Sequence, residues 1–301
     1  MITRIADNTR YDTIAGNISN LQDGASRASE QVSTQKKINQ PSDDPEGATT
    51  VLNLRAAGAS IDQYKTNIMS GDTWLKMTEL HLSSINDLLL QAQGVAQNVG
   101  ASYTDRTGAA DSLQNIRDQI LTFANAQLDG RYLFSGSKTD TKPFPDTAGA
   151  YQGDSGALLM NIGQDSTTGY NIAGNAVFPP SAKGGVALFE AFDNLNAVLR
   201  NLSSSDTDVS AALASFQAAG QQVHQQAQDN ITKTSVMLSN LAFSDTHLTY
   251  LKDRVVNMLG KTEDADTSQL AMEIQMQALA LNASYTAAAK ITQGSLLNFL
   301  Q

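Results

Sequence analysis

Proline is confined to two short parts of this chain of 301 residues, and this confinement limits what the chain can fold into. Pro41 and Pro45 flank one turn, and the other four prolines, at positions 143, 145, 179 and 180, fall in one later segment. A proline inside a helix removes a backbone hydrogen bond and clashes with the preceding turn, at a cost of about 3 kcal/mol. The proline-free stretches 46–142 and 181–301 are therefore open to long helices, with a non-helical segment between them.

Apolar residues recur at alternating steps of three and four, the pattern of a coiled-coil seam. This pattern covers residues 11–32, 54–99, 113–127, 188–202 and 209–260, and the last helix shows an apolar face over residues 270–288 and ends in the apolar residues of 296–300. A helix over residues 46–99 would be roughly 80 Å long at a rise of 1.5 Å per residue. The pattern predicts a mainly α fold, a long antiparallel helical bundle or coiled coil in which residues 46–127 pack on residues 188–260.

The segment between residues 130 and 185 has a different composition, with glycine and proline concentrated in it. Asp129-Gly130 is a turn signal, and residues 131–135 have the composition of a strand. Short apolar pieces at 157–162, 170–172 and 176–178 indicate a small β-rich outer domain inserted in the helical bundle. We therefore expect three domains: 1–40 with 265–301 as a terminal coiled coil, 41–130 with 186–264 as a helical rod, and 131–185 as the insert.

The charge balance disfavours nucleic acids and anionic membranes as partners. The formal net charge is −10, and no cluster of Lys or Arg relieves it locally. Binding to phosphate groups requires several cations on one face. No run of about 18 apolar residues occurs, so we expect no membrane insertion. The first residues lack the apolar core of a cleavable signal peptide, so we expect any export to use another route.

No constellation of residues supports catalysis, a cofactor or a metal. Gly153-Asp-Ser-Gly156 is similar to a serine-protease nucleophile motif, but its histidine base is missing, since His81 lies in the middle of a predicted helix. Ser135 and Lys138 fit an S-x-x-K pattern without its companion motifs. His81, His224 and His247 are scattered, and the chain has no cysteine. We expect a protein that is not an enzyme.

The turn at residues 39–46 contains a strong helix-start signal. Asp44 is a good N-cap, and Pro45 suits the first helical position. Pro41 and Asp43 complete the turn, and Glu46 complements the positive end of the helix dipole. We expect helix capping rather than calcium binding, because the loop lacks the pattern of an EF-hand.

The two ends of the chain are expected to bury their apolar seams against other molecules. Burying the large apolar residues of 11–32 contributes roughly 10 kcal/mol in sum. Ordering some 30 residues of backbone costs on the order of 30–60 kcal/mol. Helix hydrogen bonds offset only part of this, so partner surfaces have to supply the rest. The predicted assembly residues are Tyr11, Ile14, Ile18, Leu21, Val32, Leu270, Ile274, Leu281, Tyr285, Ile291, Leu296, Leu297 and Leu300.

Three segments resemble the bacterial flagellin superfamily, and more narrowly its hook–filament junction proteins. Residues 39–45 match the Asn-Pro-Ser-Asp-Asp-Pro turn of that family, with Gln40 as one extra residue. Residues 116–120, Ile-Arg-Asp-Gln-Ile, match the helix that precedes the inserted domain, and residues 130–136, Gly-Arg-Tyr-Leu-Phe-Ser-Gly, match the segment where the chain leaves the helices. The family often opens Met-Arg-Ile-Ser, whereas here Arg4-Ile5 is shifted by two residues.

The resemblance implies a structural adaptor of the bacterial flagellum, exported unfolded and located outside the cell. Its implied partners are copies of itself in a tubular layer, hook-associated protein 1, flagellin and an export chaperone. Residues 1–40 and 265–301 would be largely disordered before assembly. A flagellin-like filament subunit is the first alternative, an intracellular coiled-coil scaffold the second, and an enzyme hidden in the insert the third.

Overall fold

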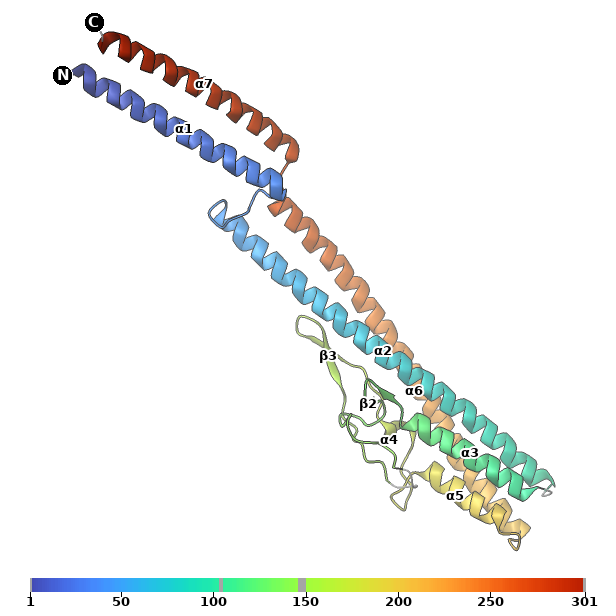
Figure 1. Ribbon diagram of the computed structural model, residues 1–301. Helices are drawn as coiled ribbons and strands as arrows, with labels where there is room; N and C mark the ends of the chain where they lie inside the picture. Colours follow the sequence, from blue (N-terminus) through green and yellow to red (C-terminus); the bar gives the residue numbers. More distant parts are fainter. Residues whose placement is uncertain (1, 103–104, 146–149, 300–301) are drawn as a thin grey trace. The chain divides into compact units, whose positions relative to one another are not determined.

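The computed structural model describes residues 2–102, 105–145 and 150–299, without the side chains of residues 2–8, 10, 11, 100–102 and 291–299. The described chain is mainly helical, with a small insert that contains two pairs of short strands (Figure 1). The predicted fold class is therefore confirmed. The chain divides into two compact units, Met1–Ser60 with Leu251–Gln301, and Ile61–Tyr250. Within the described residues, no helix combines the length and the apolar character that crossing a bilayer requires.

The first unit contains the two ends of the chain as a pair of antiparallel helices. Helix α1, Ile2–Thr34, lies beside helix α7, Thr267–Phe299, so that both termini lie at the same end of the pair (Figure 1). The unit also includes the first residues of α2, Pro45–Ser102, and the last residues of α6, Asp206–Glu263. The turn after α1 and the turn after α6 meet at this point.

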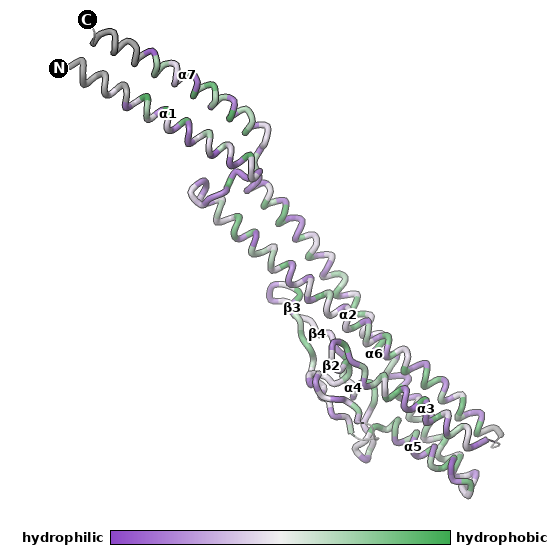
Figure 2. The backbone as a smooth tube through the Cα atoms, viewed as in Figure 1, coloured by the Kyte–Doolittle hydropathy of each residue, from purple (hydrophilic) through white to green (hydrophobic). Residues whose placement is uncertain are grey.

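The second unit is a helical bundle. The remainder of α2 and α6 is joined there by α3, Arg106–Ala124, and α5, Ala187–Arg200, which pack against each other. Hydrophobic residues recur at intervals along α2 and α6, as Figure 2 shows. The buried Arg117 on α3 pairs with Asp193 on α5 at 2.7 Å, which neutralises its charge inside the bundle.

The insert connects α3 to α5. Strands β1, Gln127–Leu128, and β2, Arg131–Tyr132, form a hairpin, and β3, Leu159–Gly163, pairs with β4, Ser166–Gly169. Asp129 and Gly130 have φ angles of 50° and 77°, the left-handed conformation that a two-residue type I′ turn requires. The predicted turn is therefore found in the structure.

The strands of the insert are shorter than the sequence indicates. The predicted strand over residues 131–135 ends at Tyr132, because the chain turns inward there and buries Leu133 and Phe134 completely. Of the other apolar pieces, residues 170–172 lie outside the strands and residues 176–177 lie in a short helix, α4, Gly174–Val177. Burial among aromatic rings, rather than strand pairing, explains these apolar residues.

Aromatic side chains form the core of the insert where it meets α5. The ring centroids of Phe144 and Phe178 are 5.0 Å apart, and those of Phe178 and Phe189 are 5.7 Å apart. The hydroxyl of Tyr151 donates to the carbonyl of Phe134 at 2.8 Å, and burial raises the pKa of this tyrosine to about 12. Aromatic packing, together with this hydrogen bond, thus holds the insert against α5.

The β3–β4 hairpin contacts α2 through a glycine. Met160 of β3 is 8% exposed and packs against Gly71 of α2. A Cβ atom added at Gly71 would lie only 1.9 Å from the terminal carbon of Met160. The same Cβ position is 3.5 Å from a methyl group of Leu241 on α6. The amide of Asn67, one helical turn earlier, donates to the carbonyl of Asn161 at 2.9 Å. The absence of a side chain at Gly71 therefore lets the hairpin sit against the helices.

Candidate assembly interface

The facing sides of α1 and α7 contain most of the predicted assembly residues that the structure describes. Ile14, Ile18 and Leu21 on α1 are half-buried, as are Ile274 and Leu281 on α7, whereas Leu270 is 6% exposed. Ala28 on α1 is buried at 2% exposure. The apolar seam of each terminal helix thus faces the other helix of the same chain.

Two predicted residues lie at the edge of this seam. Val32 is 40% exposed. Its neighbour Gln31 is half-buried in its place, and the side-chain amide of Gln31 donates to the carbonyl of Lys37 at 2.9 Å. Tyr285 is 48% exposed, and its hydroxyl accepts a hydrogen bond of 2.9 Å from the amide of Gln22 across the pair. A strict seven-residue repeat drifts around a straight helix, which moves some of its positions to the side. The side chains of the remaining predicted residues lie outside the described part: Tyr11, Ile291, Leu296, Leu297 and Leu300.

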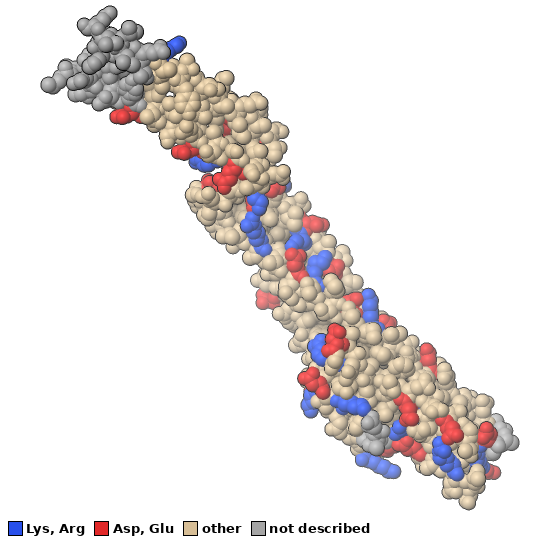
Figure 3. All heavy atoms as spheres, in the orientation of Figure 1, with Lys and Arg blue, Asp and Glu red and all other residues tan. Residues whose placement is uncertain are grey.

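Helix α7 has a second apolar side, which was not among the predicted residues. Met272, Met276 and Leu279 are 59%, 69% and 75% exposed. At 100° per residue they lie on the side opposite Leu270 and Ile274, which face α1. Their spacing of four and three was visible in the sequence, but only the seam that faces α1 was identified there. Figure 3 shows a mostly uncharged surface over the described part of the α1–α7 pair.

The turn between α1 and α2 forms as the sequence indicates. The carboxylate of Asp44 accepts the backbone N–H of Gly47 at 2.9 Å, and α2 begins at Pro45. The carboxylate of Asp43 accepts the backbone N–H groups of Asn39, at 3.0 Å, and Gln40, at 2.9 Å. These two donors hold the pKa of Asp43 below its usual value. The turn is thus closed by its own carboxylates.

A buried carboxylate joins this turn to the end of α6. Glu263 is 3% exposed and pairs with both Lys36, from the turn, and Arg55, on α2. The backbone N–H of Lys37 donates to the carbonyl of Glu263 at 2.8 Å, and the N–H of Ala265 donates to the carbonyl of Gln35 at 3.0 Å. We call these contacts the Glu263 cluster. It holds together the turn at which α1 ends and the turn from which α7 starts.

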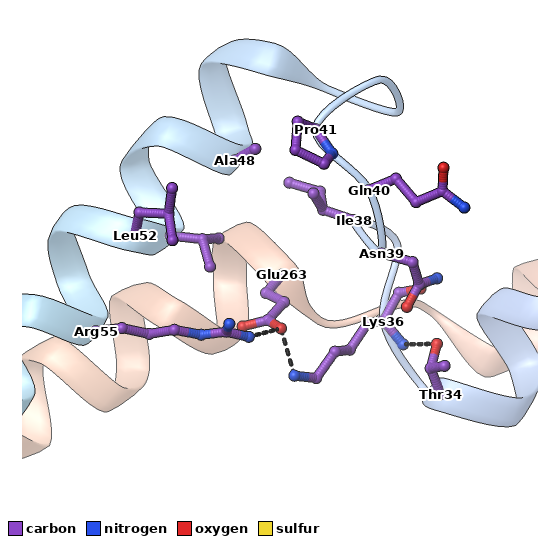
Figure 4. A pocket seen from close by; sticks show the side chains of 11 residues that line it. Thr34, Lys36, Ile38, Asn39, Gln40, Pro41, Ala48, Leu52, Arg55 and Glu263 are labelled. Carbon is purple, nitrogen blue, oxygen red and sulfur yellow. Dashed lines mark hydrogen bonds and ion pairs between the residues drawn. The ribbon is translucent and has the colours of Figure 1, made fainter.

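A hollow of about 530 Å³ opens beside the Glu263 cluster. Figure 4 shows Ile38, Pro41 and Leu52 on one side of it, and Arg55, Lys36 and Glu263 on the other. Leu52 is 62% exposed, whereas Ile38 is 8% exposed. Gly47 lies under Ile38, and a Cβ there would meet the Ile38 side chain at 2.5 Å. The hollow therefore has an apolar wall and a charged end.

The motifs considered for catalysis or metal binding either stabilise a loop or do not bring the required side chains together. The carboxylate of Asp154 accepts the backbone N–H and the hydroxyl of Ser137, both at 2.6 Å, and the N–H of Gly156 at 2.9 Å. These donors hold the pKa of Asp154 below its usual value. Burial lowers the pKa of His81, whose ring lies 5.6 Å from that of Phe123. Among the described residues, no group of three His, Asp or Glu side chains is placed to hold a metal ion.

Sequence comparisons relate this chain to flagellar proteins. The family model of the bacterial flagellin N-terminal helical region matches residues 5–139. Over 300 residues the chain is 28% identical to the flagellar hook-associated protein 3 of Salmonella typhimurium, covering 94% of this chain and 95% of that protein. Over 305 residues it is 27% identical to the Escherichia coli protein of the same name, with the same coverage of both.

Structure comparisons agree with the sequence comparisons. The structure of a putative flagellar hook-associated protein from Vibrio parahaemolyticus has a TM-score of 0.68 and 25% identity, and covers 74% of this chain and 100% of that one. The structure of flagellar hook-associated protein 3 from Legionella pneumophila has a TM-score of 0.60 at 15% identity, and covers 70% of this chain and 98% of that one, which supports the fold. The resemblance to the flagellin superfamily and its hook–filament junction proteins is confirmed.

Proposed function

We infer that this chain, a relative of the flagellar hook-associated protein 3 family, is a structural component of the bacterial flagellum that acts at the junction between hook and filament. The similarity extends over 94% of the chain, so it includes the terminal helices, the bundle and the insert. A local motif shared by unrelated proteins does not produce a match of that length.

The observation that carries the proposal is the apolar character of α7 on two opposite sides. One side packs on α1, and the other presents Met272, Met276 and Leu279 to solvent. The sequence of α7 contains two charged residues, Glu273 and Lys290. A helix that is apolar on more than one side belongs in the interior of an assembly. We therefore expect α7 to be buried on both sides in the assembly, with α1 covering one side and a neighbouring molecule covering the other.

The energetics point to ordering on assembly. Full burial of each of the three exposed side chains contributes about 1.5–3 kcal/mol, which the isolated chain does not obtain. The seam between α1 and α7 contains several half-buried residues and Ala28, so it is less apolar than a full helical core. We propose that α1 and α7 form a weakly stable pair in the free chain. Neighbouring molecules then stabilise the pair in the assembled layer.

The proposed partners are those of a junction layer. Copies of this chain would form a tubular layer, with hook-associated protein 1 on one side and flagellin on the other. An export chaperone would hold the chain before assembly, and the assembled protein would lie outside the cell. The residues that would take part from the chain's ends are the predicted seam residues of α1 and α7.

Deleting the gene and restoring it tests the function. We expect cells without the chain to secrete flagellin monomers and to lack filaments, while hooks still form. The restored chain should co-purify with hooks detached from the cells. A variant truncated after residue 264 removes α7 and should be absent from those hooks. Normal filaments in the deletion strain would refute the proposal.

A filament subunit is the alternative that one observation favours. The matching family model describes the N-terminal helical region of flagellin itself. A flagellin forms long filaments on its own, whereas a junction protein is present in few copies and does not. Electron microscopy of the purified chain at high concentration distinguishes the two, since long filaments would support the alternative.

A further inference from the structure

We propose that the exposed side of α7 in one copy of this chain docks into the hollow beside the Glu263 cluster of a neighbouring copy. This inference rests on the proposed function and deepens it, because it names the two surfaces that meet between copies. The docking side consists of Met272, Glu273, Met276 and Leu279. The receiving surface is the hollow lined by Ile38, Pro41, Ala48, Val51, Leu52 and Arg55.

The two surfaces match in length. On α2, the lining residues Ala48, Val51, Leu52 and Arg55 are spaced by three, four and seven residues, which places them on one side of the helix. Seven residues of helix span about 10 Å. Met272 and Leu279 are also seven residues apart on α7. Each surface is therefore a helical strip of the same length, as helix-to-helix packing requires.

The two surfaces also match in chemistry. Ile38, Pro41 and Leu52 give the hollow an apolar wall, and the half-exposed Leu52 lacks a full cover within its own chain. The charged end contains two cations, Lys36 and Arg55, against one carboxylate, Glu263, which leaves one positive charge in excess. The acidic residue of α7 is Glu273, one turn from Met276 and beside the apolar strip. An apolar strip with one acid therefore meets an apolar wall with one excess cation.

Charge pairing fixes the direction of docking. Arg55 lies at the α2 end of the hollow that is farther from the turn, and Glu273 lies at the Met272 end of the strip. Bringing these two charges together makes the neighbour's α7 antiparallel to α2. In that register Met276 lies opposite Leu52, and Leu279 lies opposite Ala48.

Such a contact uses two different surfaces of the same molecule. A contact of this kind repeats from copy to copy and builds a ring or a helical layer rather than a closed pair. Within a single chain the two surfaces do not cover each other, since Leu52 is 62% exposed and Met276 is 69% exposed.

Cysteine cross-linking tests this inference in the intact, assembled protein. The chain contains no cysteine, so every cross-link comes from an introduced pair. The variant L52C/M276C replaces the wild-type chain in its host, and detached hooks are treated with a short bis-maleimide. We expect a ladder of dimers, trimers and larger products, because each copy contributes both halves of the contact. Each single variant should stay monomeric.

Further variants make the result specific. Ala48→Cys with Leu279→Cys is a second pair in the same register and should give the same ladder. Ala48→Cys with Met272→Cys fits only a parallel arrangement and should give none. Gln22→Cys with Tyr285→Cys, across the α1–α7 pair, should cross-link within one chain and so verifies the chemistry.

The outcomes separate this inference from the proposed function. If the cysteine-free chain is absent from detached hooks, the proposed function fails and this inference fails with it. If the chain is present and the Gln22–Tyr285 control reacts, while both antiparallel pairs stay monomeric, this inference alone is overturned. Closed dimers without higher products would also contradict it, since they indicate a symmetric contact.

Discussion

Replacing Gly71 by alanine should destabilise the second unit, although alanine is the better helix former. The new Cβ would lie 1.9 Å from the terminal carbon of Met160, so this side chain has to leave its place between α2 and the hairpin. Methionine is flexible and moves without breaking the helix. The expected result is a hairpin that detaches from α2 while the helices remain folded.

The two opposing effects can be estimated. Gly→Ala inside a helix gains about 1 kcal/mol from backbone propensity. Exposing Met160, which is 8% exposed in the folded chain, loses about 1.5–3 kcal/mol of burial. The difference is a net destabilisation of about 0.5–2 kcal/mol. When Met160 is already alanine, only the propensity term remains, so Gly71→Ala should then stabilise by about 1 kcal/mol.

Urea unfolding followed by tryptophan fluorescence measures this effect. Trp74 is the only tryptophan of the chain, lies one turn after Gly71 and is 1% exposed, so its emission reports unfolding of the second unit. Gly94 is the matched control, because a Cβ there meets nothing within 4 Å. Gly94→Ala should raise stability by about 1 kcal/mol. If Gly71→Ala stabilises the chain as much as Gly94→Ala does, the packing argument is wrong.

Three further changes address the terminal unit. Glu263→Gln should lower the free energy of unfolding of the terminal unit by about 1–2 kcal/mol and speed proteolysis within residues 36–45, because it removes the buried charge that pairs with Lys36 and Arg55. The loss is moderate because both cations also reach water. An unchanged digestion rate would show that the Glu263 cluster is dispensable. Ile18→Asp should leave the thermal midpoint of the second unit unchanged yet abolish filament attachment, since it places a charge in the α1–α7 seam; normal motility would contradict this. The pKa of Asp43 is lowered in the folded chain, so the stability that its carboxylate gives the turn is fully present above pH 3.8, the ordinary pKa of an aspartate, and is lost as the pH falls through the lower pKa of the folded chain. Amide exchange at Asn39 should therefore speed up at that low pH in the wild type. The variant Asp43→Asn should show no such pH dependence.

The helices and the turn at Pro45 were predictable because their signals are local. Proline placement and a period of three and four define α2, and an Asp before a Pro marks where it begins. The Asp-Gly pair likewise specified the β1–β2 turn through its left-handed backbone. Each of these features depends on a few neighbouring residues, which a single sequence displays.

Contacts between distant residues were not predictable in the same way. Glu263 and Arg55 are 208 positions apart, and nothing near either residue indicates the other. Gly71 lies within the predicted seam of residues 54–99, but the side chain that occupies the space beside it, Met160, belongs to a hairpin some ninety residues later. The expected strand at residues 131–135 was too long because Phe134 is buried in an aromatic core rather than alternating across a sheet.

The expected disorder of the chain's ends stays a prediction. The structure describes α1 and α7 as helices, and their pairing within one chain is compatible with a weakly stable unit that neighbours reinforce. The division into a terminal coiled coil, a rod and an outer insert also stays a prediction. The compact units of the structure are instead bounded after Ser60 and before Leu251.

Amide hydrogen exchange, compared between the free chain at high dilution and the chain in detached hooks, tests the central claim most directly. The account predicts that amides of α1 and α7 exchange much faster than those of α2 in the free chain, and become protected on assembly. Protection of α1 and α7 equal to that of α2 in the free chain would contradict it.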